Sequence, residues 1–529
     1  MKRLLAGLLL ALPTTSLLAQ GDPAQYADDA FRYNDFVQQG SARFRAVGGN
    51  HAALGGDASN IAGNPAGLGF YNRSEFTLSP SLNLLSGKST FLGSNLNAEK
   101  TNVNIGQLSV VFAGQTSPNS RWRRSSFGVS YSQSLNFSDQ VDASGLNKNT
   151  NSTFLNEYIP GLNKGGPGSV KEADLNRDFS PSNNTTRTPE AALYGLYLIN
   201  ATPYGANTIQ TNGSPFFNND LDARLARNQR VTATRSGANS QWTFAYGSNF
   251  EDKLYLGVSA NISRLRYDSQ ITVRESPVNG DFDNYGRTNN LLVTGTGVGL
   301  TVGAIYRPVQ SFQVGLTAST PTFYSMKETF QQTFFAFGRV PVLVNNLKGG
   351  NTLKVDPNDF DYTMTTPFRA SGGLTYFLGG GKYGFLTATA DYVAYGGMNM
   401  GTDGLSTSQG NADFKNAVKS EVKSTYQNVV NVKAGAEVRV NILRVRAGVA
   451  YLPTAYRIDL DRISADARAR TLFTGGVGVR TDRFSVDLSG SFYNQKSGLS
   501  PYFLNDADTP TVSTTTQRAN AMLSVGLFF

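Results

Sequence analysis

The alternation of apolar and polar residues in this chain is clearest at its C-terminus, where every second residue back from Phe529 is apolar. Positions 527, 525, 523, 521 and 519 are apolar, and the positions between them are polar or small, among them Arg518, Asn520 and Ser524. This period of two predicts a β-strand with one face towards hydrocarbon and the other towards a lumen. We therefore expect the chain to end with the closing strand of a membrane barrel.

Similar alternating stretches begin at Glu75 and predict an all-β fold, a transmembrane antiparallel β-barrel of about fourteen strands. We expect strands near 75–85, 103–114, 124–138, 230–248, 253–273, 289–306, 311–335, 362–378, 383–397, 426–439, 442–457, 470–480, 483–494 and 516–529. Short turns alternate with long connections near 86–102, 139–229, 275–288, 336–361, 398–425, 458–469 and 495–515. Tight periplasmic turns and long external loops are typical of barrels in a Gram-negative outer membrane.

Two neighbouring predicted strands indicate which face is lumenal. Val430, Val432, Ala434, Ala436 and Val438 share one face, and the other carries Lys433, Glu437 and Arg439. A charge facing lipid at mid-bilayer costs about 2–4 kcal/mol, so the charged face must be lumenal. The next strand repeats the pattern, with Arg444 and Arg446 inward. These charges form either a structural ion-pair lattice or a site for a ligand carboxylate.

The N-terminal region does not have the strand pattern. Residues 1–19 read as a signal peptide, with Met1-Lys2-Arg3, an apolar run and a cleavage site after Ala19. Residues 20–72 are rich in Gly, Ala and Asn and lack sustained alternation. A barrel of this size has a lumen too wide for its own side chains to fill. We therefore predict that 20–72 forms a hatch, a plug inside the barrel of residues 73–529.

Composition limits the chemistry of the chain. It has no cysteine and one histidine, His51, and its formal net charge is +9. A single histidine in the predicted hatch favours neither a catalytic site nor a transition-metal site. The basic residues are scattered over strands and loops, which argues against nucleic-acid binding. We therefore expect no enzyme activity, no metal and no cofactor.

The segment Asn64-Pro65-Ala66-Gly67, between the signal peptide and the first strand, resembles the hatch signature of the FadL/TodX family of outer-membrane transporters for hydrophobic compounds. Tyr306-Arg307-Pro308 and Tyr451-Leu452-Pro453 resemble paired-strand phrases of the same family. The resemblance implies a monomer, surrounded by outer-membrane lipid and lipopolysaccharide, that takes up hydrophobic small molecules such as long-chain fatty acids by diffusion. It also implies a lateral exit at a kinked third strand, here 124–138, although alternation in that stretch shows no obvious kink before Leu135-Asn136-Phe137.

Three groups of residues are candidate ligand contacts. Thr188-Pro189-Glu190 predicts the start of a capped, largely apolar helix that includes Leu193, Tyr194 and Tyr197. Phe334 and Phe335 form an aromatic run, and Arg444 and Arg446 are the lumenal cations. For the helix, packing onto other loop segments is an equally good interpretation. For the phenylalanines, girdle or loop packing is the stronger one.

Two other classes of function remain open from the sequence. A general diffusion porin would have an open, charged constriction and no plug. A barrel serving as a protein-interaction or secretion-system component would have the same strands and hatch.

Overall fold

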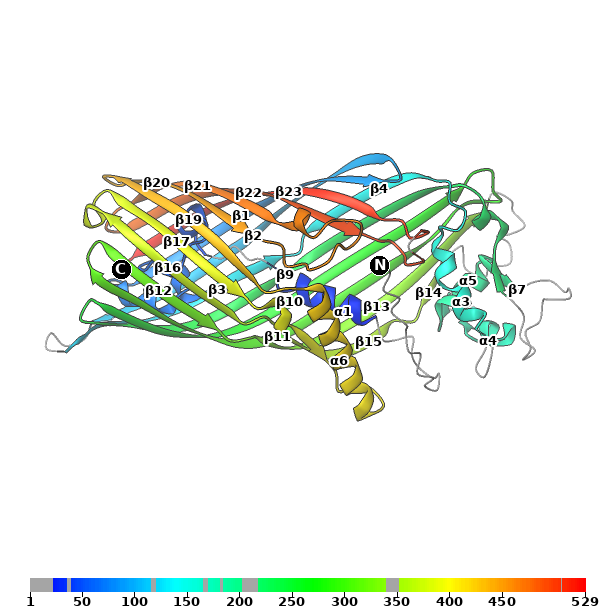
Figure 1. Ribbon diagram of the computed structural model, residues 1–529, viewed down its shortest axis with the longest axis horizontal. Helices are drawn as coiled ribbons and strands as arrows, with labels where there is room; N and C mark the ends of the chain where they lie inside the picture. Colours follow the sequence, from blue (N-terminus) through cyan, green and yellow to red (C-terminus); the bar gives the residue numbers. More distant parts are fainter. Residues whose placement is uncertain are drawn as a thin grey trace, which may run out of the picture.

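The computed structural model describes residues 22–35, 40–115, 120–164, 170–180, 184–201, 217–338, 352–505 and 507–529. The predicted signal peptide lies outside these ranges, as does part of the predicted loop 336–361. The described chain forms a closed antiparallel barrel of 14 strands, which confirms the predicted fold (Figure 1). The first strand closes the barrel by pairing with the last, from Glu75↔Phe528 to Thr90↔Ser513.

Several walls of the barrel are formed by one strand each, and three are formed by two consecutive strands. In chain order they are β1 (Glu75–Phe91), β2 (Ser94–Gln115), β3 (Trp122–Asn136) with β4 (Asp139–Asn147), β9 (Arg227–Phe250), β10 (Leu254–Pro277), β11 (Phe282–Val309), β12 (Phe312–Ser319) with β13 (Phe323–Gly338), β15 (Asn358–Thr365) with β16 (Arg369–Leu378), β17 (Gly384–Val393), β19 (Val429–Val440), β20 (Leu443–Leu452), β21 (Arg470–Arg480), β22 (Phe484–Leu499) and β23 (Val512–Phe528).

Helices and short strands make up the rest of the described structure. The α-helices are α1 (Pro23–Arg32), α2 (Ala42–Ala46), α3 (Ile159–Leu162), α4 (Glu172–Arg177), α5 (Pro189–Gly195) and α6 (Ser408–Thr425). The 3-10 helices are η2 (Ala58–Ile61), η3 (Pro65–Phe70), η4 (Phe154–Glu157), η5 (Leu221–Arg224), η7 (Gly379–Gly381), η8 (Tyr395–Gly397) and η9 (Asp466–Arg468). The short strands are β5 (Phe179–Ser180), β6 (Thr185–Thr186), β7 (Ile199–Ala201), β8 (Phe217–Asn219), β14 (Thr352–Val355) and β18 (Asn399–Gly401).

The outer face of the barrel carries large apolar side chains, whereas the inner face is polar. Val432 and Val438 are about half exposed, and Lys433 and Glu437 between them are buried. Such a wide exposed apolar surface is stable only against lipid, so the predicted assignment of faces holds. Among the described residues, no helix is long and apolar enough to cross a membrane.

The wall of the barrel is uneven in height. β9, β10 and β11 have 24, 24 and 28 residues, whereas β17, β19 and β20 have 10, 12 and 10. Figure 1 shows the long strands continuing to the end that carries α3, α4 and α5, while the short ones stop near the middle of the molecule. Because about 9–11 residues suffice to cross a bilayer, the short strands end at the membrane surface and the long ones continue beyond it.

The predicted long connection at 86–102 is wrong. β1 and β2 continue through this stretch as a paired hairpin that turns between Phe91 and Ser94. Above the membrane the outer face of these strands lies in water and carries polar side chains such as Lys88. The stretch therefore shows no sustained apolar alternation, although its backbones are paired and its inner face is buried from Leu85 to Phe91.

Candidate functional site

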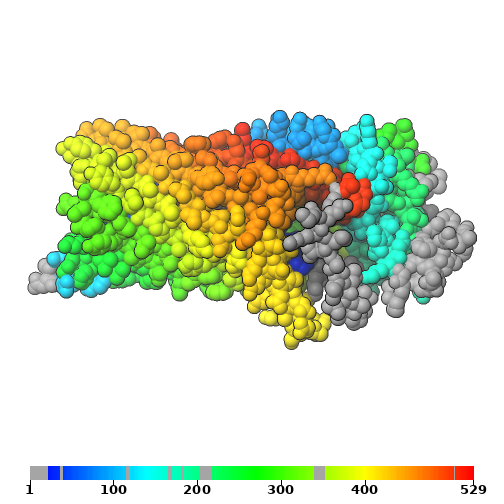
Figure 2. Space-filling view, in the orientation of Figure 1, coloured from blue at the N-terminus to red at the C-terminus, as the bar shows by residue number. Residues whose placement is uncertain are grey.

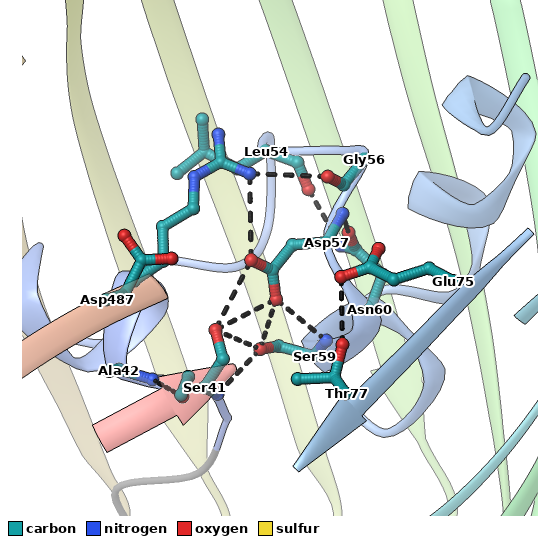
Figure 3. Close-up of polar contacts among 12 residues, drawn as sticks. Ser41, Ala42, Leu54, Gly56, Asp57, Ser59, Asn60, Glu75, Thr77 and Asp487 are labelled. Atoms are coloured by element: carbon teal, nitrogen blue, oxygen red, sulfur yellow. Dashed lines mark hydrogen bonds and ion pairs between the residues drawn. The ribbon is translucent and has the colours of Figure 1, made fainter. Parts of the chain in front are cut away.

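Residues 40–72 are the part of the predicted hatch 20–72 that lies in the lumen nearest the C-terminus, and from here on we use the name hatch for this part. Asp57 organises it (Figure 3): its carboxylate accepts hydrogen bonds from Ser41 Oγ at 3.0 Å, Ser59 Oγ at 2.6 Å and the Ser59 backbone N–H at 2.9 Å. Asp57 and Asn60 form a capping box at the start of η2. These bonds fix the two halves of the hatch to each other.

The motif Asn64-Pro65-Ala66-Gly67 forms the start of η3 and is buried. The Asn64 side chain caps η3 by accepting a hydrogen bond from the Ala66 N–H at 3.1 Å, and donates one to the Ala52 carbonyl at 2.6 Å. Proline at the first helical position needs no hydrogen-bond acceptor there. The motif therefore builds the fold of the hatch locally.

The hatch lies directly against the inner wall at glycines. A Cβ at Gly303 would collide with the Asn64 side chain, at Gly257 with the Pro65 backbone, and at Gly315 with the Ala52 carbonyl. Gly435 and Gly448 make comparable approaches to Val47 and Gly48. Glycine is needed at these positions because only a wall without side chains lets the two backbones come so close.

Charged groups join the hatch to the wall on its other side. Glu437 accepts bonds from Arg446 and Arg439 at 2.7 Å each, and Arg43 of the hatch lies 3.6 Å from both Glu437 and Asp57. Arg446 also binds Asp487 at 2.6 Å. Three of the predicted lumenal charges, Glu437, Arg439 and Arg446, therefore form an ion-pair lattice that includes the hatch.

The upper part of the lumen contains α1. The Tyr426 hydroxyl donates to Asp28 at 2.6 Å, Arg470 binds Asp35 at 2.8 Å, and the Asp29 carboxylate pairs with Arg32. Burial raises the pKa of Asp28 and of Asp29, although Tyr426 and Arg32 oppose the shift. The bond to Asp28, and the pair at Asp35 just after the helix, thus hold α1 within a cluster of aromatic side chains.

The barrel wall is interrupted between β2 and the third wall. The β2–β3 ladder runs from Gln115↔Arg124 to Gln107↔Ser132 and ends there. β3 stops at Asn136, β4 starts at Asp139 and pairs with β9, and no ladder joins β2 to β4 among the described residues. A cavity of about 130 Å³ opens here, lined by both inward Leu85 and outward Leu84 of β1. We call this break in the ladder the wall gap.

Amide side chains connect the wall gap to the hatch. Arg45 Nη1 of α2 donates to Asn520 Oδ1 at 3.2 Å, and Asn520 Nδ2 donates to Asn83 Oδ1 at 2.8 Å. Asn83 Nδ2 donates to Asn104 Oδ1 at 2.7 Å, and Asn104 donates across the gap to Gln133. We call these four amides the amide network. Asn520, Asn83 and Asn104 each accept from one neighbour and donate to the next, so a continuous series of hydrogen bonds joins α2 to the gap.

Two cavities lie inside the barrel beside the wall gap. One, of about 200 Å³, lies between the hatch and the upper lumen and is lined largely by Ser, Thr and Asn side chains. The other, of about 260 Å³, lies against α1 and shares Leu135, Asn136 and Arg518 with the cavity of the gap. Aromatic and apolar lining of these cavities is confined to patches such as Phe31, Phe137 and Tyr395.

The predicted ligand contacts do not come together in one place. Leu193 and Phe334 are completely buried in the hydrophobic core of the external loops, with Tyr194 at its edge. Phe335 is also buried, and Tyr197 is partly exposed. Arg446 is bound in the ion-pair lattice, and Arg444 lies at the opposite end of the barrel, where it donates to Asn441 and Leu443 carbonyls. Ligand contact by these residues stays a prediction.

The sequence did not single out the amide network or the wall glycines. The available signal for the network was that Asn and Gln recur at lumenal positions of four strands, Asn83, Asn104, Gln133 and Asn520. Within the described ranges, no group of three or more His, Cys, Asp or Glu side chains is placed so that it could hold a metal ion.

Fold and site together define a closed β-barrel with an internal hatch and a lateral break in its third wall. The Pseudomonas putida toluene transporter TodX has a similar structure, with a TM-score of 0.51, 14% identity and coverage of 93% of this chain and 99% of TodX. A Pseudomonas aeruginosa FadL homologue has a TM-score of 0.51 and 12% identity, and the match covers 94% of this chain and 99% of the homologue. A deltaS2 mutant of the TodX monoaromatic hydrocarbon channel has a TM-score of 0.50 and 13% identity, and the match covers 94% of this chain and 100% of the mutant.

The chain therefore has the barrel fold of the FadL/TodX-type proteins along nearly its whole length. No protein-family model matches its sequence, and no curated protein matches it significantly.

Proposed function

We propose that this chain is an outer-membrane channel for the passive uptake of hydrophobic small molecules, a class that includes long-chain fatty acids and aromatic hydrocarbons. The observation that carries the proposal is the wall gap, where the β2–β3 ladder ends at Gln107↔Ser132. A ligand that left through it would enter the lipid directly. An acyl chain gains about 0.8 kcal/mol for each methylene that it removes from water, so this route avoids the cost of an aqueous exit.

The structure supports a route in three parts. A ligand would enter beside α1, occupy the cavity of about 260 Å³, and pass Leu135 and Asn136 into the wall gap. The hatch blocks the path straight down to the periplasm, because Asn64, Pro65, Ala66 and Gly67 are buried against the wall. Amides and charges line much of this route, which favours ligands that carry a polar group beside an apolar part.

A cross-linking experiment tests the gap as the exit. The sequence has no cysteine, so Asn104→Cys and Gln133→Cys introduce the only thiols. Two amide side chains separate these backbones, a span longer than a disulfide bridges, so a short bis-maleimide is the appropriate linker. We expect uptake of radiolabelled oleate and toluene into proteoliposomes to fall about tenfold after cross-linking, with each single-cysteine variant unaffected by the reagent.

A matched control uses the same reagent on the paired hairpin of β1 and β2. Thr90 and Asn95 are exposed, lie opposite each other and share a hydrogen bond. Cross-linking the corresponding cysteines should leave uptake unchanged. Full uptake after complete cross-linking at 104 and 133 would exclude the wall gap as the exit. A large steady conductance in a planar bilayer without hydrophobic uptake would instead identify a porin.

Variants of the hatch motif give a second test. Asn64→Ala removes the cap of η3 and the bond to Ala52, at a cost of about 1 kcal/mol. We expect altered uptake with normal barrel assembly, seen as unchanged heat-modifiable mobility in gel electrophoresis. Unchanged uptake of every hydrophobic compound would argue against a gating role for the motif.

A further inference from the structure

A shallow apolar groove lies on the lipid-facing wall, on the side of the barrel with the short strands. It has a volume of about 480 Å³ and crosses β11, β12, β16, β17 and β19. Its floor consists of small residues, because Gly372 lies opposite Ala390 and Ala318 lies opposite Ala370 in the ladders. Exposed bulky side chains stand along its edges: Val302, Leu316, Tyr392 and Val430. A floor this smooth lets a flexible chain pack closely against the wall.

Helix α6 lies at the membrane surface above the same strands. It connects β18 to β19, and β17 and β19 cross the bilayer with only 10 and 12 residues. Figures 1 and 2 show α6 projecting outward past the outline of the barrel, so that it overlies the surrounding lipid. Its apolar side, Phe414, Val418 and Val422, is buried towards the barrel, where α6 packs on α1 and β18.

A row of lysines runs along one flank of α6, next to its buried apolar side. Lys415, Lys419 and Lys423 follow each other at intervals of four residues, so they lie on one side of the helix. All three are exposed, and none forms an ion pair with any other residue in the described ranges. The nearest acidic residues of the helix are engaged otherwise, since Asp413 accepts from Gln409 at 2.8 Å and Glu421 accepts from Thr425 at 3.3 Å.

A hydrogen-bonded connection joins the groove to the end of α6. Asn428, which follows the helix, donates to the Tyr392 hydroxyl at 2.9 Å and accepts from the Gly396 N–H at 3.0 Å. Tyr392 pairs with Val430 at the upper end of the groove. The lysines and the groove therefore belong to one sector of the surface, with the cations at the level of lipid headgroups and the apolar floor at the level of acyl chains.

We propose that this sector binds a phosphate-bearing lipid of the outer leaflet, with an acyl chain in the groove and the phosphate on the lysines of α6. The charge of the lysine row complements an anionic headgroup, and the groove faces the hydrocarbon that holds its chain. The inference rests on the proposed outer-membrane location and not on uptake. Because α6 packs on α1, lipid bound there also stabilises the side of the lumen that α1 occupies.

Native mass spectrometry of the purified full chain in detergent tests the proposal with added lipid A as the probe. We expect a retained one-to-one complex. The variant Lys415→Gln/Lys419→Gln/Lys423→Gln and the groove-filling variant Gly372→Leu/Ala390→Leu should each lower retention by about tenfold. Substitutions at two exposed lysines of the opposite turns, Lys253→Gln/Lys382→Gln, should leave it unchanged. Heat-modifiable gel mobility verifies that every variant is folded.

Two further ligands distinguish a lipid phosphate from free phosphate. Dephosphorylated lipid A should bind weakly, and millimolar inorganic phosphate should not displace the intact lipid. Wild-type retention in either the lysine or the groove variant would overturn the proposal. A dimer of the barrel that the groove variant abolishes would overturn it as well, since the groove would then hold a second copy of the chain.

Discussion

The ring of Tyr33, directly after α1, packs edge-on against Phe137 with their centroids 5.8 Å apart. Phe137 is the residue at which the third wall is interrupted, between β3 and β4. Tyr267 contacts both rings, at 5.5 Å and 5.4 Å. The segment that fills the upper lumen therefore also supports the broken wall, so displacement of α1 removes a support from the wall gap.

Replacing Tyr33 by alanine should loosen α1 and the gap together. We expect at least a tenfold loss of hydrogen-exchange protection in α1 and at Phe137, because a buried aromatic contact of this kind contributes about 1 kcal/mol beyond its burial. Oleate uptake should rise. The control is Tyr383→Ala in the turn between β16 and β17, where the side chain is exposed. Full protection in Y33A would show that α1 is held by its polar contacts alone.

Replacing Gly315 by alanine should displace the hatch without disturbing the barrel. The new methyl group would collide with the Ala52 backbone, and overpacking of this kind costs about 1–3 kcal/mol. We expect faster proteolysis of the hatch and a higher single-channel conductance. Gly490→Ala is the control, because the nearest atom to its Cβ is 4.0 Å away. Unchanged conductance and proteolysis would mean that the hatch moves aside at no cost.

Replacing Glu437 by glutamine should destabilise the protein strongly. The side chain is 1% exposed and binds Arg446, Arg439 and Arg43. The substitution removes the charge that these three cations share, and leaves Arg446 with Asp487 and Arg43 with Asp57. We expect the free energy of unfolding in urea to fall by about 3–5 kcal/mol. Glu251→Gln provides the comparison, because its ion pair with Arg121 is exposed and should contribute nothing measurable. Equal effects of the two substitutions would contradict this role of the lattice.

The docking of α1 should weaken as pH rises. Burial raises the pKa of Asp28 and Asp29 above the ordinary value of 3.8, so the docked state binds protons more tightly than the undocked state. Docking is therefore strongest at low pH, and it weakens progressively as the pH rises from 3.8 through the raised pKa values of the two carboxyl groups. Hydrogen exchange of α1, corrected for intrinsic rates, measures this trend. Asp29→Asn should flatten it, and Asp413→Asn on the exposed side of α6 should not.

The strand count and the direction of each face could be predicted from the sequence because lipid imposes them residue by residue. Val432 and Lys433 sit on opposite faces as their polarity requires. The upper hairpin of β1 and β2 could not be located, since its outer face lies in water and is polar, so no apolar face towards lipid marks the strands. The wall gap could not be predicted for a related reason. The alternation of apolar and polar residues depends on what surrounds each side chain, so it continues through Leu135 whether or not the backbone is paired with a neighbouring strand.

The candidate site was only partly accessible to such reasoning. The motif at Asn64 and Pro65 marks the hatch because a capped helical turn has a local sequence signature. The motif contacts Gly257 and Gly303, and Ala52 of the hatch contacts Gly315. These contacts join residues about two hundred or more positions apart, and no local pattern reveals them. The amide network is equally non-local, since Asn83 and Asn520 become neighbours only when the barrel closes.

That closure has a consequence for the order of assembly. Ser74 and Phe529 exchange two backbone hydrogen bonds of 3.0 Å, and the Ala42 N–H of the hatch donates to Ser524 Oγ of the last strand at 2.8 Å. The hatch precedes the barrel strands in the chain, and its partner Ser524 lies in the last strand, β23. The hatch therefore cannot form its contact with Ser524 until β23 has been placed beside β1. A chain shortened by its last strand would lose both the seam of the barrel and a contact that keeps the hatch in place.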